Sequence, residues 1–267
     1  MTGRRDGPVL VINPNSSEVV TEGLRRALDG FRRPGGPAIE CITDLAGPPG
    51  IVTQREVDEA ALRVGALTER RRDAGAIVIA CYSQPGLDLA RSLTGAPVVG
   101  IQDAGVLTAL ALADTFGVVA VSPLSIPRHL RVLRRIGVEG RLAGEVAIEG
   151  ISVADSGHGE DSYAALLSAG LRLRSLGAGA VVLGCAGMAG HRARLEEELA
   201  LPVIDPTQAA VALALGLLLS RAVRPAGARR HPTVTASASG TNSSSAAVPS
   251  TKVRTAKLPG RSSAVSG

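Results

Sequence analysis

The sequence predicts an α/β protein of two pseudo-symmetric lobes, each a four-stranded, mainly parallel sheet flanked by helices. Short apolar runs rich in β-branched residues alternate with longer amphipathic segments, as in βα units. The chain also repeats itself, because GAIVIAC ends at Cys81 and GAVVLGC ends at Cys185. A helix-like stretch and a second apolar run follow each copy, with prolines at Pro97 and Pro202. One pattern written twice predicts two similar lobes.

Each strand is placed on an apolar run and each helix on the amphipathic segment that follows it. The runs VLVIN, AIVIA and VVLG are continuously apolar, as in strands buried on both faces of a parallel sheet. The predicted strands are Pro8–Asn13, Ala38–Thr43, Ala76–Cys81, Val98–Gly100, Thr115–Val121, Val146–Ser152, Ala180–Cys185 and Pro202–Ile204. The predicted helices are Ser17–Gly30, Gln54–Asp73, Gly86–Leu93, Ala104–Ala113, Ile126–Ile136, Asp161–Leu176, Ala189–Leu199 and Ala209–Ser220.

These elements form a first lobe over residues 8–105 and a second over 106–208, and the helix at 209–220 is expected to pack back onto the first lobe. Residues 225–267 are rich in Ser, Thr, Ala, Pro and Gly and are expected to be a disordered tail, because they bury too little apolar surface. The tail carries six basic residues and no acidic one, whereas the first 224 residues sum to −1. The folded part therefore has no charge that favours nucleic acid.

Compartment and membrane contact are also bounded by the sequence. Three cysteines without a secretory signal predict a reduced, cytoplasmic protein. The longest apolar stretch, AAVALALGLLL from Ala209, is shorter than the roughly 20 residues that span a bilayer. No membrane role is expected.

Ligands of open α/β sheets bind outside the carboxyl ends of the strands. Four turns lie there, at residues 13–17, 81–85, 122–125 and 185–188, and each leads into a helix. Free N–H groups at helix starts can hold a carbonyl or carboxylate oxygen, and their field should lower the pKa of a thiol from about 8.5. Two cysteines at equivalent turns, Cys81 and Cys185, predict two thiols that face one cleft.

Each candidate residue also has a purely structural interpretation. A single cysteine at a strand end is more often a small buried apolar residue, and Cys41, which has no counterpart in the other lobe, is assigned to the core. Asn13 and Ser17 suit a turn and a helix cap as well as a binding site. His158 is expected in a surface loop.

Cofactor and metal signatures are missing from the sequence. It has no C-x-x-C pair, and its four histidines do not have the spacing of metal ligands, so no metal site is predicted. It has neither a P-loop nor a G-x-G-x-x-G turn after a strand, so no nucleotide cofactor is predicted.

The segments INPNSS, ACYSQPGLDLAR, VLGCAGM and PVIDPTQAAVALA resemble the aspartate/glutamate/hydantoin racemase superfamily, and within it the hydantoin and allantoin racemase branch. The resemblance covers about residues 8–220. It implies a cofactor-independent racemase, usually a homo-oligomer, that acts on a small molecule. It also implies a catalytic pair, Cys81 and Cys185, and a substrate pocket lined by Asn13, Ser17, Ser83, Ser122, Ala186 and Gly187.

A 5-substituted hydantoin or allantoin is the substrate that this resemblance favours. The second cysteine is followed by Ala-Gly-Met, which offers no partner for the ammonium of an amino acid. One thiolate would remove the C5 proton, whose loss the adjacent carbonyl supports, while the opposite thiol donates one. Maleate isomerisation or amino-acid racemisation on the same scaffold remain alternatives. Malonate decarboxylation, which uses one cysteine, and ligand binding without turnover fit two matched thiols less well.

Overall fold

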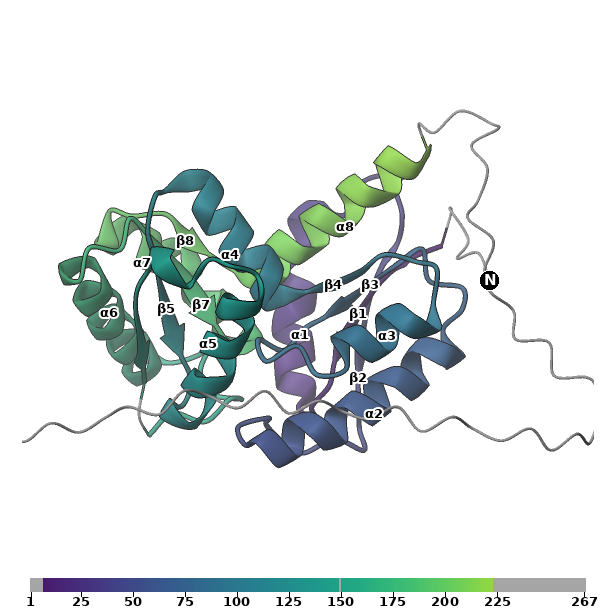
Figure 1. Ribbon diagram of the computed structural model, residues 1–267, viewed down its shortest axis with the longest axis horizontal. Helices are drawn as coiled ribbons and strands as arrows, with labels where there is room; N and C mark the ends of the chain where they lie inside the picture. The colour runs from purple at the N-terminus through teal and green to yellow at the C-terminus, as the bar shows by residue number, and fades with distance from the viewer. Residues whose placement is uncertain (1–6, 149, 223–267) are drawn as a thin grey trace, which may run out of the picture. The chain divides into compact units, whose positions relative to one another are not determined.

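The computed structural model describes residues 7–148 and 150–222, and in this part of the chain it contains two four-stranded parallel sheets flanked by helices (Figure 1). The strand order is β2-β1-β3-β4 in the first sheet and β6-β5-β7-β8 in the second, so both lobes have the same topology. All pairings between neighbouring strands are parallel. The predicted fold class is confirmed.

The helices and strands alternate along the chain as the sequence pattern indicates. The first lobe has strands β1 (Val9–Asn13), β2 (Ile39–Thr43), β3 (Ala76–Ile79) and β4 (Val98–Gly100), and helices α1 (Glu18–Ala27), α2 (Gln54–Arg70) and α3 (Leu87–Leu93). The second lobe has strands β5 (Phe116–Ala120), β6 (Leu142–Ala147), β7 (Ala180–Gly184) and β8 (Val203–Ile204), and helices α5 (Ile126–Arg135), α6 (Glu160–Ser175) and α7 (Arg192–Leu199). The remaining helices are α4 (Ile101–Leu112) and α8 (Pro206–Ala222), and short 3₁₀ turns are η1 (Asp29–Phe31), η2 (Pro123–Ser125), η3 (Glu139–Arg141) and η4 (Ala186–His191).

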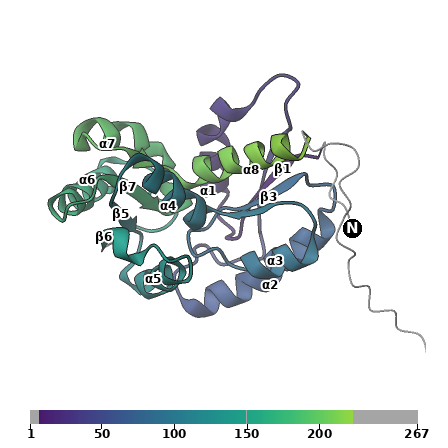
Figure 2. The same cartoon turned by 45° about the horizontal axis from the view of Figure 1, so that its top comes forward.

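The two lobes share one core, which α4 and α8 complete. Along β1, Val9 and Val11 join the shared apolar cluster, whereas Leu10 and Ile12 point to the other face, under α2 and α3. Helix α4 follows the last strand of the first lobe yet packs on β7, and α8 follows the last strand of the second lobe yet packs on β3. The two helices contact each other, and in both views they come together near the centre of the molecule (Figures 1 and 2). The lobes are therefore joined by exchanged helices.

Local sequence explains where the helices that flank the site begin. Helix α1 starts after Ser17, whose hydroxyl accepts from the Val20 N–H. Helix α2 starts with a capping box, in which Thr53 and Glu56 accept each other's backbone N–H. Both capping side chains come from residues within one turn of the helix start. The first residues of α1 and α2 could therefore be predicted from the local sequence.

One strand is misplaced by the sequence. The predicted strand Val146–Ser152 is wrong in position, because β6 is Leu142–Ala147. The apolar run that suggested it continues into a loop, and Gly150 adopts φ 75°, outside the extended region. The real strand is an edge strand whose residues are intermediate in overall burial, and it contains Gly144 and Glu145, so it lacks a strong apolar signal.

The remaining boundaries differ little. Helices α4 and α8 each begin three residues earlier than predicted, directly after the preceding strand. The proposed division at residue 105 lies inside α4 and stays a prediction, and the predicted tail at 225–267 lies outside the described residues. No helix in the described ranges has the length and apolarity needed to cross a bilayer.

Candidate active site

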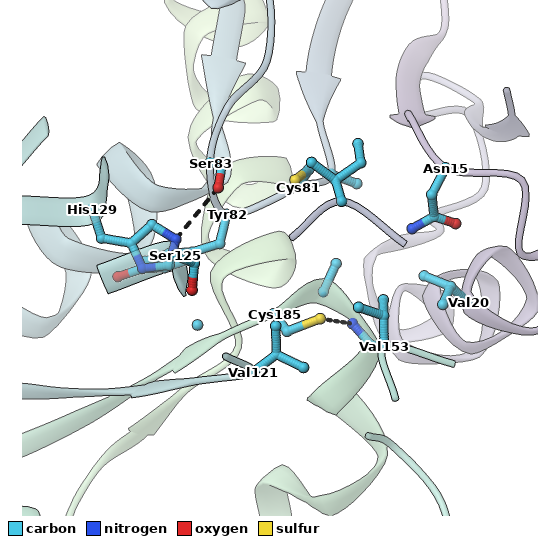
Figure 3. A pocket seen from close by; sticks show the side chains of 15 residues that line it. Asn15, Val20, Cys81, Tyr82, Ser83, Val121, Ser125, His129, Val153 and Cys185 are labelled. Carbon is cyan, nitrogen blue, oxygen red and sulfur yellow. Dashed lines mark hydrogen bonds between the residues drawn. The ribbon is translucent and has the colours of Figure 1, made fainter. Parts of the chain in front are cut away.

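The two cysteines of the repeat line one small cavity between the lobes. Cys81 follows β3 and Cys185 follows β7, and they approach the cavity from opposite sides (Figure 3). The cavity has a volume of about 30 Å³, which is room for about two water molecules. Its polar lining side chains, besides the thiols, are those of Asn15, Tyr82, Ser83, Ser125 and His129. Among the described residues that line it, none carries a carboxylate.

The turn after Cys81 is held in a tight conformation by the side chain of Gln84, which is part of the turn. Gln84 has φ 50°, in the left-handed region, and its N–H donates to the Cys81 carbonyl at 2.9 Å. The Gln84 amide exchanges hydrogen bonds with Asp103 at the start of α4, at 2.8 and 2.9 Å. It lies against Gly100, where a Cβ would stand 1.9 Å from Gln84 Oε1. Glycine at position 100 therefore leaves space for the Gln84 side chain, whose hydrogen bonds to Asp103 hold this turn in place.

The turn after Cys185 is simpler. The Gly187 N–H donates to the Cys185 sulfur at 3.4 Å, so the thiol caps η4. The Ser156 hydroxyl lies 3.9 Å from the same sulfur and also donates to the Val153 carbonyl at 2.9 Å. The described groups that hydrogen-bond to this sulfur are therefore all neutral.

Burial dominates the acidity of both thiols. It raises the pKa of Cys81 to about 12, although the Ser83 N–H, the Arg128 charge and the Gln84 N–H act to lower it. Burial also raises the pKa of Cys185, against smaller lowering effects of the Gly187 N–H and the Ser156 hydroxyl. The expectation that the helix starts would bring the pKa of both thiols toward neutrality is therefore wrong for this site. Desolvation of the thiolate outweighs the N–H groups.

Asn15, rather than Asn13, reaches the cavity from the turn after β1. Asn13 is fully buried, and its amide donates to Asn15 Oδ1 at 3.0 Å and to Thr21 Oγ1 at 3.0 Å. The Ser17 N–H also donates to Asn15 Oδ1, at 2.9 Å. With its oxygen held in this way, Asn15 turns its amide nitrogen to the cavity side (Figure 3). Asn13 and Ser17 thus position Asn15, and a direct role for them in binding stays a prediction.

The other residues predicted to bind substrate divide between two spaces. Ser83, Ala186 and Gly187 line the cavity with the thiols. Ser122 lines a wider outer pocket of about 580 Å³, which shares Val121 and Val153 with the cavity. The described side chains around the outer pocket are otherwise mostly apolar and include Val52, Ile148 and Ile151. The four turns predicted from the sequence therefore lie close together, but Ser122 borders the outer pocket and the other turns border the cavity.

Several residues of the site were missed by the sequence reasoning. His129 lies on the buried face of α5 with Leu133, one turn away, and this helical spacing was the available signal. Its partner Glu145, Nδ1 to Oε1 at 2.5 Å, was hidden by the misplaced strand. Val121 ends the predicted strand Thr115–Val121 and Val153 lies just beyond the misplaced strand, and neither was singled out as a site residue although both wall the cavity.

Residues assigned to other roles lie where expected. Cys41 is in the shared core, and burial raises the pKa of its thiol. His158 is exposed. The described ranges hold no group of three or more His, Cys, Asp or Glu side chains placed to bind a metal ion.

The chain is similar in sequence and in fold to known racemases. The sequence pattern of the Asp/Glu/Hydantoin racemase family matches residues 9–214. A hydantoin racemase of Paenarthrobacter aurescens is 36% identical over 220 residues, which cover 79% of this chain and 90% of that protein. The structure of allantoin racemase from Klebsiella pneumoniae is 30% identical, with a TM-score of 0.75 over 80% of this chain and 89% of that one. Allantoin racemase from Pseudomonas fluorescens is 25% identical, with a TM-score of 0.72 over 85% and 99% of the two chains.

Proposed function

Because the chain belongs to the Asp/Glu/hydantoin racemase family and is an isomerase of the racemase type, we propose that it racemises 5-substituted hydantoins through Cys81 and Cys185, without a cofactor. The observation that carries this proposal is the placement of the two thiols on opposite sides of one cavity. Each thiol has the backbone N–H of the second residue after it, in Ser83 and in Gly187, directed at its sulfur. A reaction that exchanges a proton across one carbon needs such an opposed donor and acceptor.

In the proposed reaction, one cysteine acts as thiolate and removes the proton from C5. The opposite cysteine acts as thiol and delivers a proton to the other face, so the configuration inverts and the thiolate changes sides. The enantiomers use Cys81 and Cys185 in opposite order. Charge develops on the ring carbonyl oxygen, and the Asn15 amide N–H on the cavity side is the donor for it.

The lining favours a neutral ring over a charged substrate. No described residue around the cavity supplies a carboxylate for the ammonium of an amino acid. Neither Lys nor Arg is among them, so the two carboxylates of maleate lack a permanent cation. A hydantoin ring is larger than the cavity of about 30 Å³, so its walls must move apart on binding.

The outer pocket bears on the ring substituent. It meets the cavity at Val121 and Val153, where a group on C5 would leave the ring. Its described lining is mostly apolar and has no charged side chain. Alkyl and aryl substituents therefore suit it better than the polar ureido group of allantoin.

Polarimetry on single enantiomers tests the proposal. D- and L-5-benzylhydantoin and 5-isobutylhydantoin should lose optical rotation, allantoin more slowly, and L-aspartate not at all. Maleate, followed by its absorbance, should be unchanged. Turnover of aspartate or maleate with none of any hydantoin would overturn the assignment.

The family resemblance also implies a homo-oligomer, which we carry forward as part of the proposal. Apolar surface on the α4–α8 pair supports it, since Leu107, Leu213 and Leu217 are 53%, 41% and 37% exposed. Sedimentation velocity of the native chain and of Leu217→Glu measures the oligomeric state. A native chain that sediments as a monomer at micromolar concentration would contradict it.

A further inference from the structure

A buried line of polar groups lies beside Cys81 and includes two residues that line the cavity, Ser83 and His129, to which the proposed proton exchange assigns no step. Glu145 on β6 and His129 on α5 are each 2% exposed at the side chain, with Oε1 and Nδ1 2.5 Å apart. The other ring nitrogen, Nε2, lies 3.4 Å from Ser83 Oγ (Figure 3). The line therefore runs from the second lobe to the turn of the first lobe that carries Cys81.

We assign one direction to the hydrogen bonds of this line. An ionised carboxylate only accepts, so Glu145 requires the proton of His129 to sit on Nδ1. In the neutral ring Nε2 is then an acceptor, and the Ser83 hydroxyl donates to it. Arg128 Nε donates to the same hydroxyl oxygen at 3.4 Å. The Ser83 side chain is thereby held from two sides.

The anchoring of Ser83 reaches the sulfur through its backbone. The Ser83 N–H bonds to Cys81, and it is the strongest of the groups that favour the thiolate there. The charged or titratable groups that act on Cys81 are Cys185 across the cavity and Arg128. Among the described residues, Cys185 has no such line, since the hydrogen bonds at its sulfur come from the Gly187 N–H and the Ser156 hydroxyl.

We propose that Glu145 and His129 are positioning residues for Cys81 alone: Glu145 fixes the tautomer of His129, His129 holds the Ser83 side chain, and the Ser83 N–H stays directed at the Cys81 sulfur. As a role in catalysis this rests on the proposed racemase reaction. The effect of the two residues on the Cys81 thiol does not rest on that reaction, and it can be measured without substrate.

The experiment compares the two thiols one at a time. Cys41→Ala/Cys185→Ala leaves Cys81 alone, and Cys41→Ala/Cys81→Ala leaves Cys185 alone. The rate of alkylation by iodoacetamide is followed from pH 6 to 11 in each background, because only the thiolate reacts. Each background is tested as it stands and with Glu145→Gln, which keeps the side-chain shape, or His129→Gln, which keeps an acceptor near Nε2.

With Glu145→Gln, Cys81 should be alkylated about three- to tenfold more slowly at pH 8, with its titration moved to higher pH. Cys185 should change less than about twofold. With His129→Gln, Cys81 should retain part of its native alkylation rate. Ser156→Ala should give the opposite pattern and slow Cys185 only.

Two controls separate positioning from general damage. Glu139→Gln removes an exposed ion pair with Arg134 close to α5, and should alter neither thiol. Thermal unfolding shows which variants are folded, and if either substitution in the dyad fails to fold, Ser83→Ala tests the same anchor while keeping the backbone N–H. Equal slowing of both thiols, or no slowing of Cys81 in a folded variant, would overturn the proposal. Because no hydantoin is used, a wrong substrate leaves this result standing.

Discussion

The two lobes share a backbone plan but surround their thiols differently. Both sheets have the same strand order, both cysteines follow the third strand, and both sulfurs receive the N–H of the second residue after them. Around Cys81 lie the Arg128 charge and the line from Glu145 through His129 to Ser83. Around Cys185 the side-chain contact is the hydroxyl of Ser156.

The same divergence occurs at two other pairs of equivalent positions. Asn15 after β1 faces the cavity, whereas Ser122, at the matching register after β5, lines the outer pocket. Gly100 at the end of β4 leaves space for Gln84, whereas Asp205 after β8 is a buried carboxylate with one unpartnered oxygen. A repeated backbone thus places groups symmetrically, and the side chains make the two faces of the site unequal.

The largest expected effect comes from removing either thiol, which tests whether the lobes are equal in the reaction. Cys81→Ala and Cys185→Ala should each lower racemisation by about 10²–10⁴-fold or more, because each removes the donor or the acceptor on one face. Each variant should still exchange the C5 hydrogen of one enantiomer with solvent deuterium, and the two variants should prefer opposite enantiomers.

Optical rotation and deuterium incorporation by NMR give these two quantities. Cys41→Ala, in the shared core, is the matched control and should keep turnover. Near-normal racemisation by Cys185→Ala would show that the second lobe contributes no acid or base.

The next effect sharpens the comparison at the turns after β1 and β5. Asn15→Asp keeps the oxygen that accepts from Asn13 and Ser17 but replaces the cavity-side donor with a negative charge. kcat/KM for 5-benzylhydantoin should fall by about 10²-fold or more, on the scale of losing one donor to a developing oxyanion. Leu124→Ala, at an exposed position in the turn after β5, should change kcat/KM little. Equal effects of the two substitutions would contradict the assignment of the donor to Asn15.

A third prediction concerns stability at the ends of β4 and β8. Burial raises the pKa of Asp205 to about 6 from its ordinary 3.8. The folded protein then binds this proton more tightly than the unfolded chain, so its contribution to the free energy of unfolding is complete below pH 3.8 and is lost as pH rises to about 6. The loss is at most about 3 kcal/mol.

Urea unfolding of the native chain and of Asp205→Asn between pH 4 and 7 measures this difference. The native chain should lose stability relative to the variant as pH rises, and the difference should level off above pH 6. Asp114→Asn, at a fully exposed side chain, should run parallel to the native chain. The same slope in Asp205→Asn and the native chain would show that this carboxyl does not carry the effect.

The last prediction concerns the pH dependence of turnover. Since burial raises the pKa of both thiols, the form with one thiolate is scarce at neutral pH and becomes more abundant as pH rises. kcat/KM should therefore increase by up to about tenfold per pH unit from pH 7 to 9. The rate without enzyme, measured in the same buffers, is subtracted. A flat profile would mean that substrate binding lowers the pKa of one thiol to near neutrality.

The sequence by itself determined the fold and the candidate pair of thiols. Buried parallel strands are written as continuous apolar runs, and a repeat of one pattern fixes equivalent positions, so GAIVIAC and GAVVLGC sufficed to place Cys81 and Cys185 at matching strand ends. The turn residues 13–17 were found for the same reason. Edge strand β6 was misplaced because a half-buried strand that contains Gly144 and Glu145 lacks that apolar signal.

Only the tertiary structure decided how those positions are used. Which of Asn13 and Asn15 faces the cavity depends on Thr21, which lies on α1 and holds the Asn13 amide. The line from Glu145 to Ser83 joins α5 and β6 to a turn of the other lobe, and no local spacing records the contact between Ser83 and His129, which are 46 residues apart. The acidity of the thiols likewise depends on how tightly the lobes close. A helix start favours a thiolate, but burial in a shared cavity costs it more, and burial is a property of the assembled lobes.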